Sequence, residues 1–150
     1  MRVSGPLGVS YLRDRHAGPV LLVAGGSGLA PIESILRTLL SRGYPERIAL
    51  YFGVRAERDL YHRGLLEDLA SRHPNFGFHA VLSEEDPDLK LRGMRGGFVH
   101  EAVAADIAEF SGYKAYLAGP PAMVEAATGM LIGRGMEHRD IHADAFYNQT

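Results

Sequence analysis

Two glycine-containing segments have residue types and spacings suited to binding a phosphorylated ligand. Gly25 to Pro31 reads Gly-Gly-Ser-Gly-Leu-Ala-Pro, and Ala118 to Val124 reads Ala-Gly-Pro-Pro-Ala-Met-Val. Glycines at positions 25, 26 and 28 let the backbone bend sharply and approach a ligand closely. Because the free amides at a helix start attract anions, the first segment predicts a site for a pyrophosphate group.

Three familiar glycine motifs do not fit this first segment as it stands. A P-loop requires Gly-Lys-Ser/Thr, and a nucleophile elbow requires a glycine two residues after its serine, but Leu29 occupies both positions. The ordinary dinucleotide fingerprint, Gly-x-Gly-x-x-Gly, fits Gly26 and Gly28 but has Pro31 in its third position. A tight connection without a ligand therefore stays open as an alternative for this segment alone.

The elements around the two turns alternate between strands and helices. Apolar runs predict strands, and apolar residues at helical spacing predict helices. Pro31 suits the first position of a helix, whereas Gly43 and Gly135 suit the C-terminal caps of two helices. The predicted strands are 19–24, 47–53, 76–82, 114–118 and 140–146, and the predicted helices are 31–42, 61–72, 97–110 and 121–134.

This alternation predicts an α/β fold with a parallel sheet and helices on both of its faces. The carboxyl ends of parallel strands lie at one edge of the sheet, so both glycine turns are expected at the edge where such folds bind nucleotides. The polar segment from 83 to 96 is predicted to be an exposed loop.

Composition limits the function classes. At 150 residues with 46% hydrophobic residues, the chain can bury the core of one domain. A net charge of -2 without a basic run excludes a nucleic-acid footprint, and neither a membrane-spanning run nor a signal peptide is present, so a cytoplasmic protein is expected. The chain has no cysteine, and His138 and His142 lack a third ligand nearby, so no metal site is expected.

Taken together, the motifs resemble the pyridine-nucleotide domain of the ferredoxin-NADP reductase superfamily, particularly the reductase components of bacterial oxygenases. The resemblance rests on Gly-Gly-Ser-Gly-x-x-Pro and Gly-Pro-Pro-x-Met, each following an apolar strand. It extends to Tyr51–Arg55 with Asp59-Leu60-Tyr61, and to Gly5–Gly8, which is similar to the end of the family's flavin domain. At the end of the chain, Asp144-Ala145-Phe146 is similar to the ending that the family places beside the flavin ring.

The resemblance implies a doubly wound five-stranded parallel sheet in the order 3-2-1-4-5. Residues 1–15 would be the end of a flavin domain with a linker, and residues 16–150 the NAD(P)-binding domain. The chain departs from the family at Ala118, where many relatives have cysteine, and it lacks the Arg-x-Tyr-Ser/Thr flavin motif. We therefore expect one domain of a longer reductase, in which FAD is held mainly by a domain outside this chain.

The function implied by the resemblance is hydride transfer from NAD(P)H to FAD, with electrons passed onward to an iron-sulfur acceptor. The partners would be the flavin domain of the same protein and a ferredoxin or oxygenase component, and a [2Fe-2S] cluster elsewhere in the full-length protein is compatible with this. The alternative is a nucleotide-binding or regulatory module without redox turnover. Neither a nucleic acid nor a membrane is an expected partner.

The resemblance implies positions near the cofactors for several residues, and it implies no single catalytic group. Ser27, Asp144 and Phe146 would lie near the nicotinamide or the flavin, although Ser27 could equally cap a helix and Phe146 could simply end a buried strand. The cofactor-binding residues would be Gly25, Gly26, Ser27, Gly28, Pro31, Val54, Arg55, Asp59, Gly119, Pro120, Pro121, Met123 and Phe146.

Two arginines and an acid bear on the choice between NADH and NADPH. Arginine after the second strand suits a 2′-phosphate, whereas an acid there suits the ribose diol. Arg55, Arg58 and Asp59 could therefore serve either cofactor. The Val-Arg-x-x-x-Asp-Leu-Tyr pattern is more similar to the NADH-using relatives, so we expect NADH with NADPH tolerated.

Overall fold

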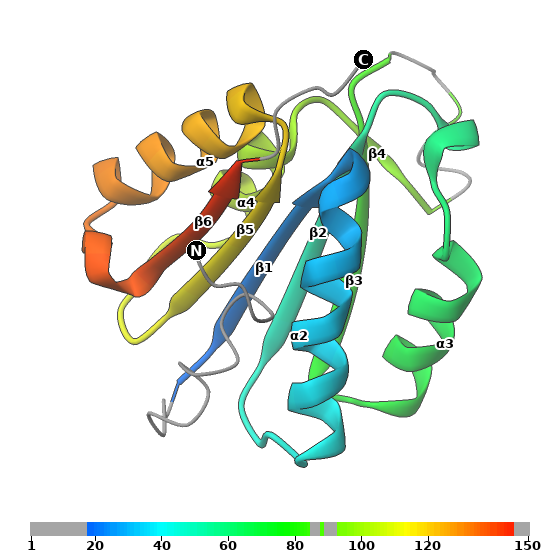
Figure 1. Cartoon of the computed structure of the whole chain (residues 1–150), viewed down its shortest axis with the longest axis horizontal. Helices are drawn as coiled ribbons and strands as arrows, with labels where there is room; N and C mark the ends of the chain where they lie inside the picture. The colour runs from blue at the N-terminus through cyan, green and yellow to red at the C-terminus, as the bar shows by residue number, and fades with distance from the viewer. Residues whose placement is uncertain (1–17, 85–87, 89–92, 146–150) are drawn as a thin grey trace.

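The structure, a computed structural model, describes residues 18–84, 88 and 93–145. Within these residues strands and helices alternate along the chain (Figure 1). The strands are β1 (Val20–Gly25), β2 (Ile48–Val54), β3 (Phe76–Leu82), β4 (Arg95–Gly96), β5 (Lys114–Gly119) and β6 (Ile141–Ala145). The helices are α2 (Leu29–Ser41), α3 (Arg63–Arg72), α4 (Val99–Asp106) and α5 (Pro121–Gly133), with short 3-10 turns η1 (Gly26–Gly28), η2 (Glu57–Asp59) and η4 (His138–Asp140).

All six strands form one sheet in the order β4-β3-β2-β1-β5-β6, and every pair is parallel. The predicted order 3-2-1-4-5 corresponds to β3-β2-β1-β5-β6 and is confirmed. The predicted number of strands is wrong, because the segment expected to be only a loop ends in a two-residue strand, β4, that extends the sheet beyond β3. Two residues are too few to produce an alternating pattern, which explains why the sequence did not indicate this strand.

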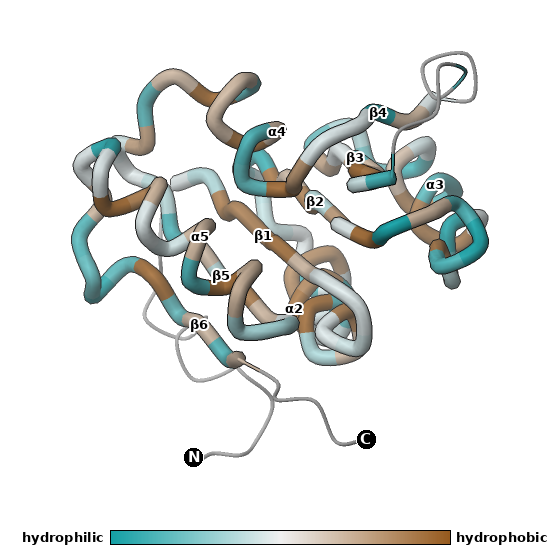
Figure 2. The backbone as a smooth tube through the Cα atoms, turned by 90° about the horizontal axis from the view of Figure 1, so that it is seen from above, coloured by the Kyte–Doolittle hydropathy of each residue, from teal (hydrophilic) through white to brown (hydrophobic). Residues whose placement is uncertain are grey.

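Helices cover both faces of the sheet, as predicted. In Figure 1, α2 and α3 lie in front of the sheet, and the view from above in Figure 2 places α4 and α5 on its other side. Successive residues of β1 point to opposite faces, so that Leu22 joins the core under α2 and α3 whereas Leu21 joins the core under α4 and α5. Because β1 is buried on both faces, it carries no polar side chain.

The helix ends agree with the predictions at two C-terminal caps and differ from them at the starts of α2 and α3. Gly43 and Gly135 have φ angles of 66° and 96°, and each follows a helix that ends in paired backbone hydrogen bonds, so both predicted caps are confirmed. Helix α2 begins at Leu29, which makes Pro31 its third residue rather than its first. Helix α3 begins only at Arg63, because His62 has a left-handed backbone with φ of 60°.

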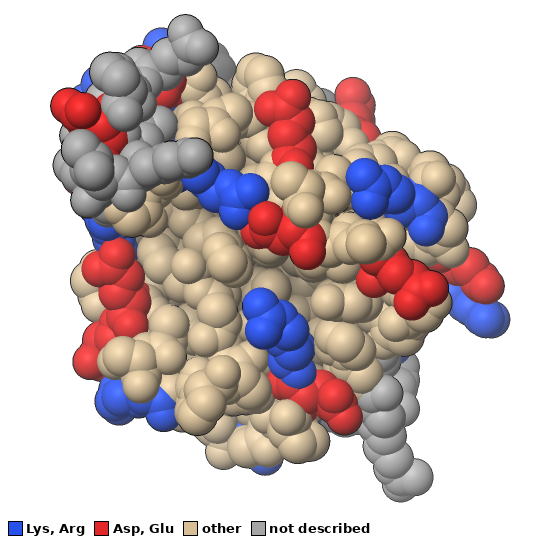
Figure 3. Space-filling model, turned by 180° about the vertical axis from the view of Figure 1, so that it is seen from behind, with Lys and Arg blue, Asp and Glu red and all other residues tan. Residues whose placement is uncertain are grey.

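The remaining surface carries mixed charge. Acidic and basic side chains are interspersed over the face that lies behind the sheet in Figure 1 (Figure 3). Within the described ranges, no helix is long and apolar enough to cross a membrane. The predicted flavin-domain remnant at 1–15 lies outside the described residues, and its assignment stays a prediction.

Candidate functional site

A cavity of about 680 Å³ opens at the carboxyl ends of β1, β2, β3 and β5. This is the edge at which both glycine turns were predicted to meet. The cavity is lined by Gly25, Gly26, Gly53, Val54, Arg55, Arg58, Asp59, Tyr61, Val81, Ser83, Gly97, Phe98, Val99, Pro120 and Met123. Seven of the predicted cofactor-binding residues are therefore brought together: Gly25, Gly26, Val54, Arg55, Asp59, Pro120 and Met123.

The glycines of the first turn have separate physical roles. Gly26 has a φ of 54°, and a Cβ atom added to it would meet no described atom within 4 Å, so glycine there serves the backbone conformation and leaves the turn open. A Cβ on Gly28 would lie 2.1 Å from the Ala118 carbonyl oxygen, so glycine there lets the start of α2 contact the end of β5. Gly28 is thus buried behind the cavity and supports the turn.

The second turn packs directly against the first. A Cβ on Gly119 would lie 2.9 Å from the Gly25 carbonyl oxygen, and a Cβ on Gly25 would lie 2.4 Å from the Met123 sulfur. Pro120 and Met123 reach the cavity, whereas Gly119 and Pro121 do not line it. The two predicted motifs therefore form one continuous wall.

Ser27, Pro31 and Asp144 are not among the residues that line the cavity. Ser27 is exposed, and Gly28 is the N-cap residue of α2, so the alternative role of Ser27 as a helix cap is wrong. Asp144 lies on β6 opposite Ala118 of β5. Phe146 falls outside the described residues, so its predicted place beside a flavin stays a prediction.

The loop after β2 supplies the charged part of the site. Arg55 and Arg58 line the cavity, and both guanidinium groups approach the same carboxylate oxygen of Glu84, at 3.7 and 3.6 Å. Asp59 accepts a hydrogen bond from the backbone amide of Ala56 at 3.2 Å, which closes the one-turn helix η2. The two arginines are therefore already paired with Glu84, which lies in the segment predicted to be an exposed loop.

Two aromatic residues at the cavity were missing from the predicted site. Tyr61 and Phe98 are 41% and 60% exposed, and among the described residues they are the large hydrophobic side chains that face solvent. Tyr61 belongs to the Asp59-Leu60-Tyr61 motif of the family resemblance but was not predicted to contact the cofactor. Phe98 follows Gly96-Gly97 and directly precedes a helix. A third glycine turn at a helix start, besides the two predicted ones, is the sequence feature that could have indicated Phe98 as a site residue.

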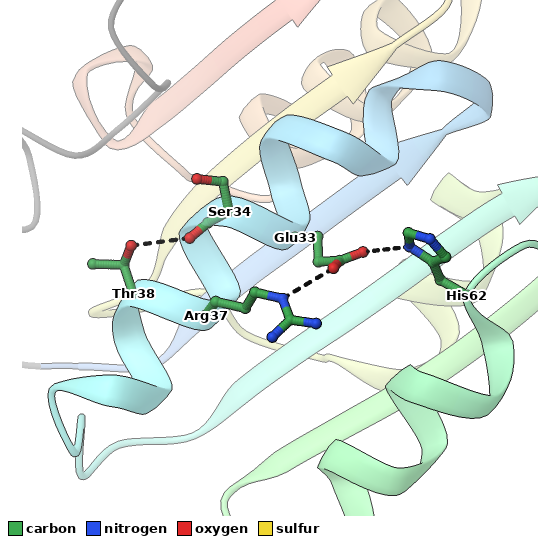
Figure 4. Close-up of polar contacts among 5 residues, drawn as sticks. All are labelled: Glu33, Ser34, Arg37, Thr38 and His62. Carbon is green, nitrogen blue, oxygen red and sulfur yellow. Dashed lines mark hydrogen bonds and ion pairs between the residues drawn. The ribbon is translucent and has the colours of Figure 1, made fainter.

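Polar contacts tie the loop before α3 to the first turn and to α2. The Tyr61 hydroxyl donates to the Gly26 carbonyl at 2.7 Å, and the His62 Nδ1 lies 2.8 Å from a Glu33 carboxylate oxygen. Arg37 donates to the other Glu33 oxygen at 3.0 Å (Figure 4). Although burial raises the pKa of the Glu33 carboxyl, hydrogen bonds from His62 and Arg37 outweigh it, so the pKa is lowered overall.

A second polar cluster holds α4, whose first turn follows Phe98. Arg95 of β4 donates two hydrogen bonds to the Asp106 carboxylate, at 2.7 and 3.0 Å, and the buried Tyr51 hydroxyl donates to it at 2.7 Å. Hydrogen bonding to Arg95 lowers the pKa of Asp106, while burial raises the pKa of Tyr51, so the carboxylate stays charged and the phenol stays a donor. The cluster fixes the two ends of the β4–α4 unit that presents Phe98 to the cavity.

Metal ligands do not gather anywhere in the described part of the chain. No group of three His, Cys, Asp or Glu residues there could hold an ion. The His142 ring stacks on Tyr116 with ring centroids 5.0 Å apart.

Taken together, the cavity is an apolar groove with the Gly26 turn at one side and the ion-paired side chains Arg55, Arg58 and Glu84 at the other. This arrangement is suited to a long ligand with a phosphate group at its centre.

Comparisons with known proteins agree with this geometry. The reductase component of the naphthalene 1,2-dioxygenase system of Pseudomonas putida is 44% identical over 147 residues, which cover 98% of this chain and 44% of that protein. The reductase component of phenol 2-monooxygenase from Pseudomonas sp. is 42% identical over 98% of this chain and 42% of that protein. This chain therefore spans less than half the length of these curated relatives.

Solved structures show the same fold. An Amycolatopsis cytochrome P450 reductase superposes with a TM-score of 0.79 at 41% identity, over 89% of this chain and 39% of that one. The ferredoxin reductase of carbazole 1,9a-dioxygenase superposes with a TM-score of 0.72 at 34% identity, over 85% of this chain and 37% of that one. The profile of the family described as the oxidoreductase NAD-binding domain matches residues 22–129. The chain therefore belongs to the oxidoreductase NAD-binding domain family of the ferredoxin reductases, as its two glycine turns and their contact across β1 and β5 indicate.

Proposed function

We propose that this chain binds NAD(P)H in the cavity at the carboxyl ends of β1, β2, β3 and β5, as the nucleotide domain of a flavin-dependent reductase. The observation that carries this proposal is the contact between the two glycine turns, which leaves the Gly26 turn open at the wall of an apolar groove. Such a turn at a helix start attracts a pyrophosphate, and the groove volume of about 680 Å³ suits a dinucleotide.

In this assignment each part of the cofactor faces residues of matching chemistry. The pyrophosphate lies over the Gly25–Gly28 turn, and the nicotinamide lies toward Pro120 and Met123, whose apolar side chains exclude water. The adenosine lies toward Arg55 and the exposed ring of Phe98, because an aromatic face at a groove edge suits stacking of a base. Ser27 and Asp144 stay as candidates beside the nicotinamide and the flavin.

The reaction is hydride transfer from the nicotinamide to a flavin, and the two cofactors supply that chemistry. What this chain contributes is binding and orientation, because hydride transfer requires the two rings to be held at van der Waals distance. FAD would be held mainly by a flavin domain of the same protein. Electrons would then pass to an iron-sulfur acceptor, either a ferredoxin or an oxygenase component, with a [2Fe-2S] cluster elsewhere in the full-length protein as one route.

We further propose that NADH is preferred over NADPH because of Glu84. Arg55 and Arg58 are the cationic side chains that line the cavity, and the carboxylate of Glu84 lies within 4 Å of both. A 2′-phosphate entering beside them must displace or face this negative charge, whereas a ribose diol need not. Because all three side chains are substantially exposed, the preference is expected to be moderate.

Calorimetric titration of the chain with NADH and with NADPH, before and after addition of FAD, tests the first proposal. We expect binding of NADH without retention of FAD. Failure of both nucleotides to bind at millimolar concentration would contradict the assignment of the cavity.

The variant Glu84→Gln tests the preference. Removing the negative charge that faces Arg55 and Arg58 should raise NADPH affinity by roughly three- to tenfold and leave NADH affinity nearly unchanged. Glu57→Gln is a matched control, since Glu57 is equally exposed and pairs with Arg63 away from the cavity lining. Equal changes for the two nucleotides in Glu84→Gln would contradict the role of Glu84, as would a preference for NADPH in the unaltered chain.

A further inference from the structure

We propose that Tyr61 is a positioning residue that fixes the peptide of the phosphate turn, and that His62 and Glu33 hold it in place. The inference rests on the proposed nucleotide function of the cavity. It concerns a contact between two loops, the turn after β1 and the connection from η2 to α3. These loops are 35 residues apart in sequence and meet through the Tyr61 hydroxyl.

The Gly26 carbonyl is the point of attachment. It accepts the Tyr61 hydroxyl at 2.7 Å and also accepts the backbone amide of Leu29, which closes η1. A trans peptide is planar, so the direction of the Gly26 carbonyl sets the opposite direction of the Ser27 amide. Gly26 itself has a left-handed backbone with open space around it, so the turn carries little steric restraint of its own. A second hydrogen bond on this carbonyl therefore fixes the direction of the Ser27 amide, in the turn that the proposed function places under the pyrophosphate.

Tyr61 is placed for this contact by its neighbours. Its ring packs edge-on against Phe52 with centroids 5.6 Å apart and against His62 with centroids 5.4 Å apart. Burial, with a smaller contribution from the charge of Glu33, raises the pKa of the phenol. The hydroxyl therefore stays protonated and remains a donor to Gly26 at neutral pH.

His62 anchors the same segment to α2. It has a left-handed backbone, which is uncommon for a residue with a side chain and is sustained only by surrounding contacts. Figure 4 shows its ring directed at Glu33, whose carboxylate also accepts a hydrogen bond from Arg37 one helical turn further on. The Glu33 side chain is only 12% exposed, so this anchor is better shielded than an ordinary surface ion pair. The segment Tyr61-His62, which follows the loop of Arg55, Arg58 and Asp59, is thus hydrogen-bonded to the Gly26 turn and to α2. It connects the proposed adenosine end of the cavity to the proposed phosphate end.

The experiment measures the dissociation constants of ADP-ribose, which contains the pyrophosphate, and of AMP, which lacks it. Both are titrated into the unaltered 150-residue chain and into Tyr61→Phe. The variant keeps the aromatic ring and removes only the hydroxyl. We expect the dissociation constant of ADP-ribose to rise by roughly three- to tenfold, the range for one net hydrogen bond, and that of AMP to change by less than about twofold.

Tyr44→Phe is the matched control. The Tyr44 hydroxyl also donates to a backbone carbonyl, that of Gly18, and Tyr44 is not among the cavity residues. We expect this variant to lower the melting temperature while both dissociation constants stay unchanged.

The outcomes separate the two proposals. Unchanged ADP-ribose binding in Tyr61→Phe, or an equal loss for ADP-ribose and AMP, would overturn the positioning role while the nucleotide site stands. If the unaltered chain binds neither ligand at millimolar concentration, the proposed function is overturned and the role of Tyr61 with it.

Discussion

Replacing Gly28 by alanine should destabilise the protein and abolish the site, because this glycine is where the start of α2 meets the end of β5. An added Cβ would lie 2.1 Å from the Ala118 carbonyl oxygen, whereas real Cβ atoms stay at least 3.0 Å away. The helix start or the strand end must therefore move by about 0.9 Å, the difference between these two distances. Both neighbours are backbone, so neither can relieve the contact by changing a rotamer.

Overpacking of this kind costs up to about 3 kcal/mol, and the absence of a flexible neighbour among the described contacts of Gly28 places it at the upper end. For a domain of this size, 3 kcal/mol lowers the melting temperature by roughly 6 to 12 °C. Urea unfolding followed by circular dichroism would give the free energy of unfolding, and calorimetry with NADH would report the site.

Gly129→Ala provides the comparison. Gly129 lies inside α5, and a Cβ there would meet no described atom within 4 Å. Alanine at this position should stabilise the protein by about 0.5 to 1 kcal/mol, because glycine is a poor helix former. The reasoning would be refuted if Gly28→Ala cost less than about 1 kcal/mol, or if it bound NADH as tightly as the unaltered chain.

Two further predictions concern the polar cluster of Tyr51, Arg95 and Asp106, and the neighbouring His79, whose ring stacks on Tyr51 with centroids 4.4 Å apart. Tyr51→Phe removes the donor to Asp106 and should cost about 1.5 kcal/mol at pH 7 in urea unfolding. The pKa of Asp106 is lowered in the folded state, so this contribution is present above the unfolded value of about 4 and is lost as pH falls through the folded pKa; a cost independent of pH down to about 2 would contradict the role of the carboxylate. Burial lowers the pKa of His79, whose Nε2 has no hydrogen-bond partner among the described residues, so stability should fall as pH decreases from about 6.5 toward the folded pKa. His79→Phe should remove that part of the pH dependence in the midpoint of urea unfolding, and an unchanged slope between about pH 7 and 5 would disprove the assignment.

Patterns that are local in sequence predicted most of the fold. The five longer strands start and end within one residue of their predicted bounds in the described range, because apolar, β-branched runs buried on both faces have a distinctive composition. The predicted caps at Gly43 and Gly135 are also present, since a left-handed residue after a helix favours glycine. The two-residue strand β4 was not predictable, because its position depends on pairing with β3 rather than on its own residues.

The candidate site was predicted only in part from the sequence. The two glycine turns and the loop after β2 were predicted, and the structure brings seven of their residues to one cavity. The predicted first helical position of Pro31 and the capping role of Ser27 are wrong, because α2 begins at Leu29 and Gly28 is its N-cap residue.

The sequence by itself determined the parallel α/β fold and its two glycine turns, and the resemblance to the family implied the order of the five longer strands. The fold and the turns follow from local composition and from motifs whose residues are contiguous. Only the tertiary structure decided that Glu84 pairs with both Arg55 and Arg58, that Tyr61 contacts the Gly26 carbonyl and that Phe98 lines the cavity. Each of these contacts joins loops that follow different strands, and the sheet order, not the spacing along the chain, sets the distance between them.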